Sequence, residues 1–187
     1  NQFVVGKGIE TLRSARCEVV AGVLEKESSE LNRRFITYHT LKRPYVILKF
    51  GKSRDGFLAP EKFISKEESW LTNEWSQKLV HKWRSEEQAI MIGTNTAITD
   101  NPLLTARLWP GKSPIRIVID KKLRLLTSLN IFNDEAPTLI FNELKSERKD
   151  NLQYLKIDFN YPLEEILHTL YIREIQSVII EGGAVLL

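Results

Sequence analysis

The sequence has little cysteine, little histidine and no long apolar run, and each shortage excludes a class of protein. One cysteine among 187 residues, Cys17, cannot form an internal disulfide, and with three histidines it cannot complete a zinc cluster. No apolar run approaches the roughly 20 residues of a membrane span, and no charged segment precedes an apolar one as in a signal peptide. The sequence therefore predicts a globular cytoplasmic protein without a metal or a membrane contact, in which Cys17 is a small buried thiol.

An excess of one charge is also missing. The net charge is +3 and the pI is about 8.9, with 27 Lys and Arg scattered among 24 Asp and Glu. Nucleic-acid binding normally requires a basic stripe, so this distribution favours a small anionic ligand instead. The length suffices for one substantial domain with an appendage.

A short apolar run followed by small polar residues is the most informative stretch. Residues 89–92 are continuously apolar, as in a strand that is buried on both faces of a parallel sheet. Gly93 then permits a sharp turn, and we expect a binding loop that carries hydroxyl and amide groups where such a strand ends. Arg107 lies beyond a turn at 100–102 and offers a planar cation suited to a carboxylate or phosphate. On spacing alone, an ordinary surface loop is the simpler interpretation.

Strands and helices are expected to alternate through the rest of the chain. Apolar runs predict strands over 45–50, 115–120, 138–141, 154–159 and from 177, with a helix over 162–171. This order implies an α/β fold with a mostly parallel sheet flanked by helices. Before residue 42, a strand over 17–21 is expected between helices over 8–16 and 25–38, and this segment is too small to form its own core.

A further helix is expected after Thr72. Its apolar residues Trp75, Leu79, Val80 and Trp83 predict the buried face, which places His81 on a solvated flank and Arg84 beside the buried face. The alternative for Arg84 is a surface ion pair with Glu87 or Glu86.

Three strand ends carry residues suited to a ligand. Lys49 ends the strand over 45–50 and either points into the crevice where parallel sheets bind ligands or extends into solvent. Gly182 and Gly183 allow backbone amides to approach a pyrophosphate, although a glycine pair after a strand is a weak signal. A basic cluster over 121–124 suits the 2′-phosphate of NADPH, although charged turns are usually just solvated.

Taken together, these stretches resemble the reductase domain of the bifunctional riboflavin-biosynthesis deaminase/reductase family. The family pattern Thr-Val-x-x-Asp-x-Pro-x-Leu-Thr-x-Arg is matched at 96–107, where only the Val is replaced, by Ala97. Its Lys-x-x-x-Ser-x-Asp-Gly segment begins here at Lys49, and its Glu-Gly-Gly-x-x-Leu-Leu closes the sequence at 181–187. Residues 6–35 resemble the end of the family's deaminase domain.

The resemblance implies two parts. Residues 1–41 would be the C-terminal remnant of a deaminase domain, as a helix, a strand and a helix, and residues 42–187 a reductase domain that lacks its C-terminal end. The reductase fold of this family resembles dihydrofolate reductase. The family's zinc ligands, a His-x-Glu and a Cys-x-x-Cys, would lie upstream, so zinc and deamination are expected only outside this sequence.

The resemblance also implies a set of site residues. Lys49 and Asp55 are candidate proton donors, between which residue order does not decide. The positions implied to bind NADPH are Lys52, Trp70, Thr96, Asp100, Lys121, Gly182, Gly183, Ala184, Val185, Leu186 and Leu187. The positions implied to bind substrate are Glu68, Arg84, Leu103, Arg107 and Glu181. Two of these depart from the family: Lys52 replaces a small residue, and Glu68 replaces a Ser and would repel a substrate phosphate.

The implied activity is NADPH-dependent reduction of the ribosyl side chain of 5-amino-6-(5-phosphoribosylamino)uracil, a small phosphorylated pyrimidine. Arg84 and Arg107 would hold the phosphate, and a homodimer is expected. Two alternatives remain: a reductase of the same fold acting on another pteridine-type substrate, and a non-enzymatic nucleic-acid-binding module, which the scattered charge disfavours.

Overall fold

A seven-stranded sheet forms the centre of the computed structural model, which describes residues 6–54, 56, 73–183 and 185–186. The strand order is β1-β7-β2-β3-β4-β6-β5, and every neighbouring pair is parallel except β5 with β6. The expected α/β class with a mostly parallel sheet is confirmed. The strands are β1 (Tyr45–Leu48), β2 (Ala89–Gly93), β3 (Ile115–Ile119), β4 (Thr138–Asn142), β5 (Glu147–Lys149), β6 (Leu152–Lys156) and β7 (Ser177–Ile180).

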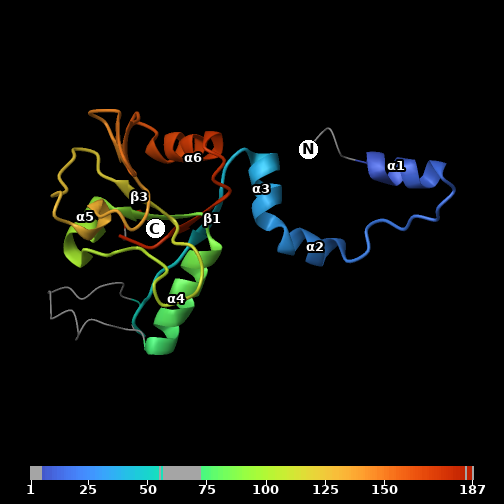
Figure 1. Ribbon diagram of the computed structural model, residues 1–187, viewed down its shortest axis with the longest axis horizontal. Helices are drawn as coiled ribbons and strands as arrows, with labels where there is room; N and C mark the ends of the chain where they lie inside the picture. The colour runs from blue at the N-terminus through green and yellow to red at the C-terminus, as the bar shows by residue number, and fades with distance from the viewer. Residues whose placement is uncertain (1–5, 55, 57–72, 184, 187) are drawn as a thin grey trace.

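Both faces of the sheet are covered, as the continuous apolar runs require (Figure 1). Alternate residues of β2 belong to two separate core clusters, with Met91 on the side of α6 (Pro162–Ile172) and Ile90 on the side of α5 (Thr94–Asp100). Pro162 occupies the first turn of α6, where its missing N–H costs no hydrogen bond. A short 3₁₀ helix, η1 (Asn130–Phe132), covers the α5 side of the sheet through Ile131.

A fully buried arginine supports that side. Arg116, in the middle of β3, has an exposed fraction of 0%. Its guanidinium donates to the backbone oxygens of Asn130, Asn133 and Ala136 and to Oδ1 of Asn133, over 2.5–3.1 Å. Arg116 therefore fixes the loop that contains η1. The sequence analysis placed this residue in a strand and assigned it no role.

The segment before β1 differs from its prediction. It contains three helices, α1 (Lys7–Ser14), α2 (Glu25–Leu31) and α3 (Arg33–Leu41), and no strand at 17–21, so the expected helix–strand–helix arrangement is wrong. Cys17 is exposed and not buried. The helix expected over 25–38 breaks at Asn32, and its apolar stripe is largely exposed: the exposed fraction of Leu31 is 82%. Apolar periodicity identifies a face but not the surface that covers it.

Only the last of these helices contacts the sheet domain closely. The Tyr38 hydroxyl donates to the Tyr171 backbone oxygen at 2.9 Å, and Arg34 forms a two-point ion pair with buried Glu87. Figure 1 shows α1 and α2 extending away from the sheet. Helix α3 is thus anchored to the domain that follows it.

Helix α4 (Glu74–Glu86) is present as expected, but its predicted buried face is wrong. The exposed fraction of Trp75 is 77%, whereas His81, expected in solvent, has a fraction of 4%. Asn73 caps the start of the helix, because its side chain accepts a hydrogen bond from Ser76 N at 3.0 Å. The side of α4 that faces the sheet is polar because it carries groups of the site described below.

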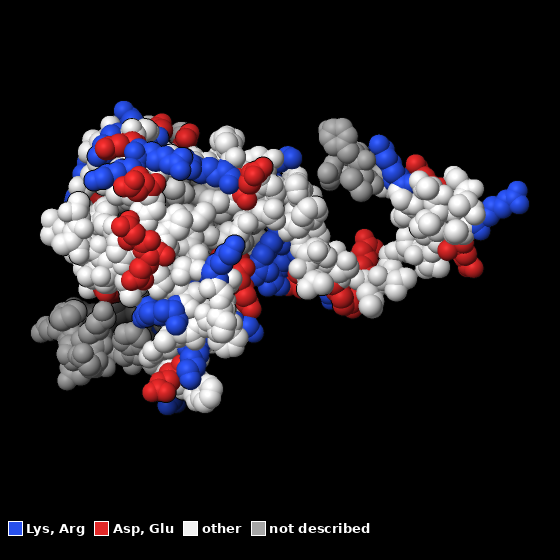
Figure 2. Space-filling model, viewed as in Figure 1, with Lys and Arg blue, Asp and Glu red and all other residues white. Residues whose placement is uncertain are grey.

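Two further features concern the surface. Basic and acidic side chains are interspersed on the face shown in Figure 2, in line with the scattered charge of the sequence. Within the described part of the chain, no helix combines the length and the apolar character that crossing a membrane requires.

Candidate active site

The two most informative stretches of the sequence meet at one edge of the sheet. Strands β2 and β7 are parallel neighbours, so their carboxyl ends lie side by side, and Glu181 N donates to Met91 O at 3.0 Å. The residues that follow these two strands therefore lie at the same edge of the sheet. The loop expected after Gly93 is wrong, because helix α5 begins directly at Thr94.

The glycine pair lies against the start of α5. Gly182 has a φ of 143° and Gly183 a φ of 55°, backbone conformations that other residues adopt at a cost. A Cβ atom at Gly183 would lie 3.2 Å from Thr96 Oγ1, and one at Gly182 would lie 3.7 Å from it. The missing Cβ atoms therefore let the Thr96 side chain pack directly against the backbone after β7. The implied cofactor residues Thr96, Gly182 and Gly183 are brought together.

A charge cluster occupies the same sheet edge. Arg84 on α4 binds Glu181 through Nε and Nη2 at 2.9 and 2.6 Å, and Lys49 Nζ lies 3.8 Å from Glu181 Oε2. The Glu181 side chain is only 6% exposed. Burial alone would raise the pKa of Glu181, but the hydrogen bonds and charge of Arg84, with help from Lys49, outweigh it and lower that pKa. Glu181 is thus a buried carboxylate between two cations, and the Lys49 side chain is directed toward it.

Arg84 retains capacity for a ligand. A guanidinium has five N–H groups, of which Arg84 uses two for Glu181 and one for Thr105 O, at 3.2 Å. Arg107 is exposed and forms no ion pair with a described residue. Two arginines with unused N–H groups near one sheet edge suit a phosphate.

His81 is a site residue that the sequence analysis missed. It lies one turn before Arg84 on α4, and burial, followed by the charges of Arg84 and Arg107, lowers its pKa from 6.5 to about 4. Its Nδ1 atom is buried and has no hydrogen-bond partner among the described residues. In the sequence, His81 lies three residues before Arg84, a spacing that places both on one face of a helix. The apolar residues of α4 instead favoured another face as the buried one.

The lowered pKa of His81 predicts a pH effect on stability. Because the folded pKa lies below the unfolded value, unfolding takes up a proton between pH 6.5 and about 4, and stability should fall as pH decreases through that range. The free energy of unfolding, measured with urea at a series of pH values, should fall more steeply with decreasing pH for the wild type than for His81→Gln. The difference in slope should correspond to the uptake of up to about one proton on unfolding. His168→Gln, at an exposed histidine of α6, is the matched control. Equal slopes for all three proteins would contradict this prediction.

The remaining predicted positions are placed as follows. Lys121 and Lys122 are exposed and both pair with Glu143, so the basic cluster is partly neutralised. Leu103 is half-buried and Lys52 is exposed. Asp100 ends α5, Leu186 is half-buried and Val185 is exposed. Asp55, Glu68, Trp70, Ala184 and Leu187 lie outside the described residues.

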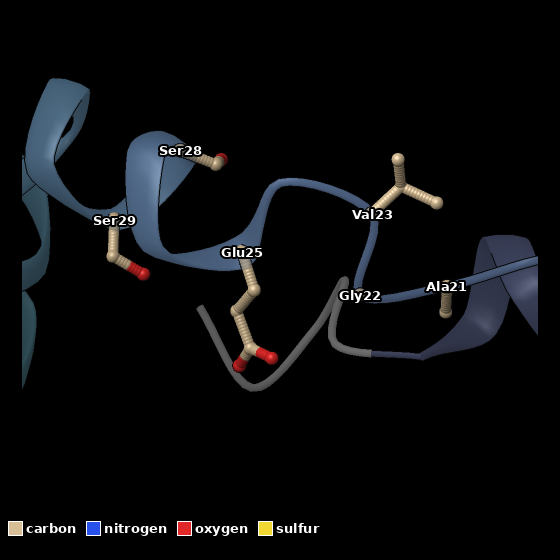
Figure 3. A pocket seen from close by; sticks show the side chains of 6 residues that line it. All are labelled: Ala21, Gly22, Val23, Glu25, Ser28 and Ser29. Atoms are coloured by element: carbon tan, nitrogen blue, oxygen red, sulfur yellow. The ribbon is translucent and has the colours of Figure 1, made fainter.

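No metal site competes with this edge in the part of the chain that is described. No group of three or more His, Cys, Asp or Glu residues there could hold a metal ion. An open hollow of about 510 Å³ lies between the loop over 21–23 and the first turns of α2, and Figure 3 shows that its lining contains one charged side chain, Glu25. That hollow lacks the convergent polar groups of a catalytic site.

Comparison with known protein families gives one match over most of the chain. The family model described as "RibD C-terminal domain" matches residues 44–187. The chain is 39% identical over 189 residues to riboflavin biosynthesis protein RibD of Aquifex aeolicus (strain VF5), covering 98% of this chain and 52% of that protein. The chain thus spans about half the length of such curated relatives.

A shorter relative and a solved structure add to this match. The chain is 34% identical over 159 residues to the 2,5-diamino-6-ribosylamino-4(3H)-pyrimidinone 5′-phosphate reductase of A. aeolicus, covering 77% of this chain and 69% of that protein. The fold is similar, with a TM-score of 0.84 and 37% identity, to the diaminohydroxyphosphoribosylaminopyrimidine deaminase/5-amino-6-(5-phosphoribosylamino)uracil reductase of Thermotoga maritima, covering 96% of this chain and 50% of that one.

Proposed function

The chain belongs to the RibD C-terminal domain family, and from this membership we propose that it reduces the ribosyl side chain of 5-amino-6-(5-phosphoribosylamino)uracil to the ribitylamino product, with NADPH as reductant. One observation carries the proposal: the ends of β2 and β7 bring the Arg84–Glu181 pair and the glycine turn at 182–183 to the same edge of the sheet. The relatives named as reductases of phosphorylated ribosylaminopyrimidines support it.

The residues at this edge fit a dinucleotide. The backbone N–H groups of the glycine turn at 182–183 would bind the pyrophosphate, and the Thr96 hydroxyl lies against this turn. Lys121, which follows β3, is a candidate for binding the 2′-phosphate of NADPH. Its ammonium would then interact with both Glu143 and the phosphate. NADPH, when bound, supplies a hydride for the carbonyl or imine carbon of the ring-opened sugar.

The charged residues would orient the substrate. Arg107 and the two unused N–H groups of Arg84 would bind the substrate phosphate, and Glu181 holds the Arg84 guanidinium in place. Lys49, whose ammonium lies at the crevice beside Glu181, is our candidate for donating the proton that completes the reduction. Orientation of the two reactants would provide much of the catalysis.

We further propose the division of the chain at residues 41 and 42 into the end of a deaminase domain and a reductase domain. The start of the family match at residue 44 supports it. The contact of α3 with Glu87 and Tyr171 indicates that the end of the first part is anchored to the second. Zinc would belong to the preceding part of a deaminase domain. A homodimer remains a prediction.

The test is NADPH oxidation by the purified protein, followed by absorbance, with the phosphorylated pyrimidine as substrate. Arg107→Met should raise the substrate KM roughly 10- to 100-fold, because charge-assisted hydrogen bonds to a phosphate are lost. Lys112→Met removes an exposed cation from the same loop and should leave the KM unchanged. Equal effects of the two substitutions would contradict the assignment of Arg107.

Two comparisons separate the alternatives. Ribose 5-phosphate should compete with the substrate if the arginines bind its phosphate, whereas a reductase of unphosphorylated pteridines should be insensitive to it. The amino-pyrimidinone substrate named for the A. aeolicus reductase should be tested beside the uracil form, because the phosphate contacts cannot distinguish them. If the folded protein fails to oxidise NADPH with both substrates, the proposed function is refuted.

A further inference from the structure

A buried aspartate lies beneath the basic turn over 121–124. Asp120 directly follows strand β3 and is 1% exposed. Its Oδ2 accepts a hydrogen bond from Leu125 N at 3.0 Å, and its backbone oxygen accepts one from Leu123 N at 3.0 Å. A buried carboxyl group is costly unless its oxygens are hydrogen-bonded. Asp120 thus closes the turn from the inside, while the three basic side chains of the turn are exposed.

The same side chain contacts the start of α5. The Thr94 hydroxyl donates to Ile119 O at 2.6 Å and lies 3.2 Å from Oδ1 of Asp120. A second link lies at the surface, where Arg124 Nη2 donates to Asn95 Oδ1 at 3.1 Å. The basic turn is therefore connected to the first residues of α5 at two points.

The other side of the turn is connected to β4. Lys121 and Lys122 both pair with Glu143, which follows that strand. In the described part of the chain, Asp120 itself forms no ion pair with Lys, Arg or His. The contacts of Asp120 are therefore those of a hydrogen-bond acceptor that shapes the turn, and the cations of the turn remain directed outward.

We propose that Asp120 is a positioning residue that holds the basic turn at a fixed place relative to the glycine turn at 182–183, and thereby sets the preference of the site for NADPH over NADH. This inference rests on the proposed function, in which the glycine turn binds the pyrophosphate and the basic turn binds the 2′-phosphate. Helix α5 joins the two turns, because it contacts Asp120 through Thr94 and the glycine turn through Thr96.

The position of the carboxyl group has a second consequence for specificity. In α/β nucleotide-binding folds, an acidic residue after a strand favours NADH by binding the ribose 2′-hydroxyl. The carboxyl group of Asp120 is instead buried and bonded to Leu125 N, so it does not offer this contact. A turn that shifts should lose its contacts with the 2′-phosphate, which NADH lacks, and leave the binding of NADH unchanged.

Steady-state kinetics can separate positioning from general structural support. Asp120→Ala removes the contacts of the carboxyl group and should raise the NADPH KM roughly 5- to 20-fold, with the KM of NADH and of substrate within about twofold. Asp120→Asn should keep all three KM values within about twofold, because its Oδ1 can accept from Leu125 N and its Nδ2 can donate to Thr94 Oγ1. Asp134→Ala, at an exposed aspartate before β4, is the matched control and should change no KM. Equal rises for NADPH and NADH, or equal effects of Asp120→Ala and Asp120→Asn, would overturn the proposal.

Binding without turnover distinguishes this proposal from the proposed function. Adenosine 2′,5′-bisphosphate and 5′-AMP differ only in the 2′-phosphate, and calorimetry can compare their affinities. The wild type should bind the bisphosphate roughly tenfold more tightly, and Asp120→Ala should lose most of this difference. Equal binding of both nucleotides to the wild type would refute the assignment of the basic turn to NADPH. A difference that persists in Asp120→Ala would refute the role of Asp120 alone.

Discussion

Glu181→Ala is expected to lower the free energy of unfolding by roughly 3–5 kcal/mol and to abolish reductase activity. The substitution leaves the Arg84 guanidinium, whose side chain is 11% exposed, without its carboxylate, and it also removes the partner of Lys49. A buried cation without a counter-charge is costly because its hydration is not replaced. Activity should be lost because Arg84 is no longer held at the candidate phosphate site. Urea unfolding and NADPH oxidation measure the two effects.

The double variant Arg84→Met/Glu181→Leu distinguishes charge burial from lost packing. It should recover most of the stability, because replacing a buried ion pair by apolar side chains is often nearly neutral, but none of the activity. Glu86→Ala is the matched control: its pair with Lys82, at 3.8 Å, is about half exposed and should contribute less than about 1 kcal/mol. Similar losses for Glu181→Ala and Glu86→Ala would contradict our view of the buried pair.

The pH dependence of the same pair has a defined sign. Because the folded pKa of Glu181 is lowered, its contribution to stability is complete above the unfolded carboxyl value, near 4.5, and is lost as pH falls through the folded pKa. The contribution of His81 is lost in a higher pH range than that of Glu181, as pH falls from 6.5 to about 4. Acid unfolding should therefore weaken this edge of the sheet in two stages.

Most of the sheet was predictable from the sequence because its central strands are largely apolar runs, whereas the charged and exposed edge strand β5 was missed. Residues 89–92 are buried on both faces, which is the environment that such a run requires. The meeting of β2 and β7 followed from placing ligand-binding residues at the carboxyl ends of parallel strands. The family resemblance implied that Arg84 and Glu181 bind substrate, but it did not predict that they bind each other.

The errors have physical causes of their own. On α4, apolar periodicity selected Trp75 and missed His81, because the side that faces the sheet is polar and serves the site. In the first 41 residues, Leu31 and Phe35 have helical spacing but are 82% and 49% exposed, since spacing does not specify a covering surface. Arg116 occupies a strand position where a pattern of residue types cannot show that its partners are backbone oxygens of a loop.

Arg116→Met should lower the free energy of unfolding by roughly 3 kcal/mol and weaken NADPH binding. The substitution keeps most of the side-chain volume but leaves buried backbone oxygens with fewer hydrogen bonds, including Asn133 O, at a cost of about 1–3 kcal/mol for each unsatisfied group. Arg116→Lys should restore little, because an ammonium cannot reproduce the planar fork that binds several oxygens. Arg148→Met, at an exposed arginine of β5, should leave stability within about 0.5 kcal/mol.

The effect on NADPH follows from what the Arg116 loop supports. Asn130 in that loop donates through its backbone N and its Nδ2 to Asn101, at 2.7 and 2.8 Å, and Asn101 caps the end of helix α5 in the left-handed conformation. Helix α5 carries Thr96, which lies beside the glycine turn. Loosening the loop should therefore raise the NADPH KM several-fold in the fraction that remains folded, with a smaller change in the KM of the substrate, whose proposed arginines lie on α4 and at Arg107. An unchanged NADPH KM in a destabilised Arg116→Met protein would show that the cofactor site does not depend on this chain of contacts.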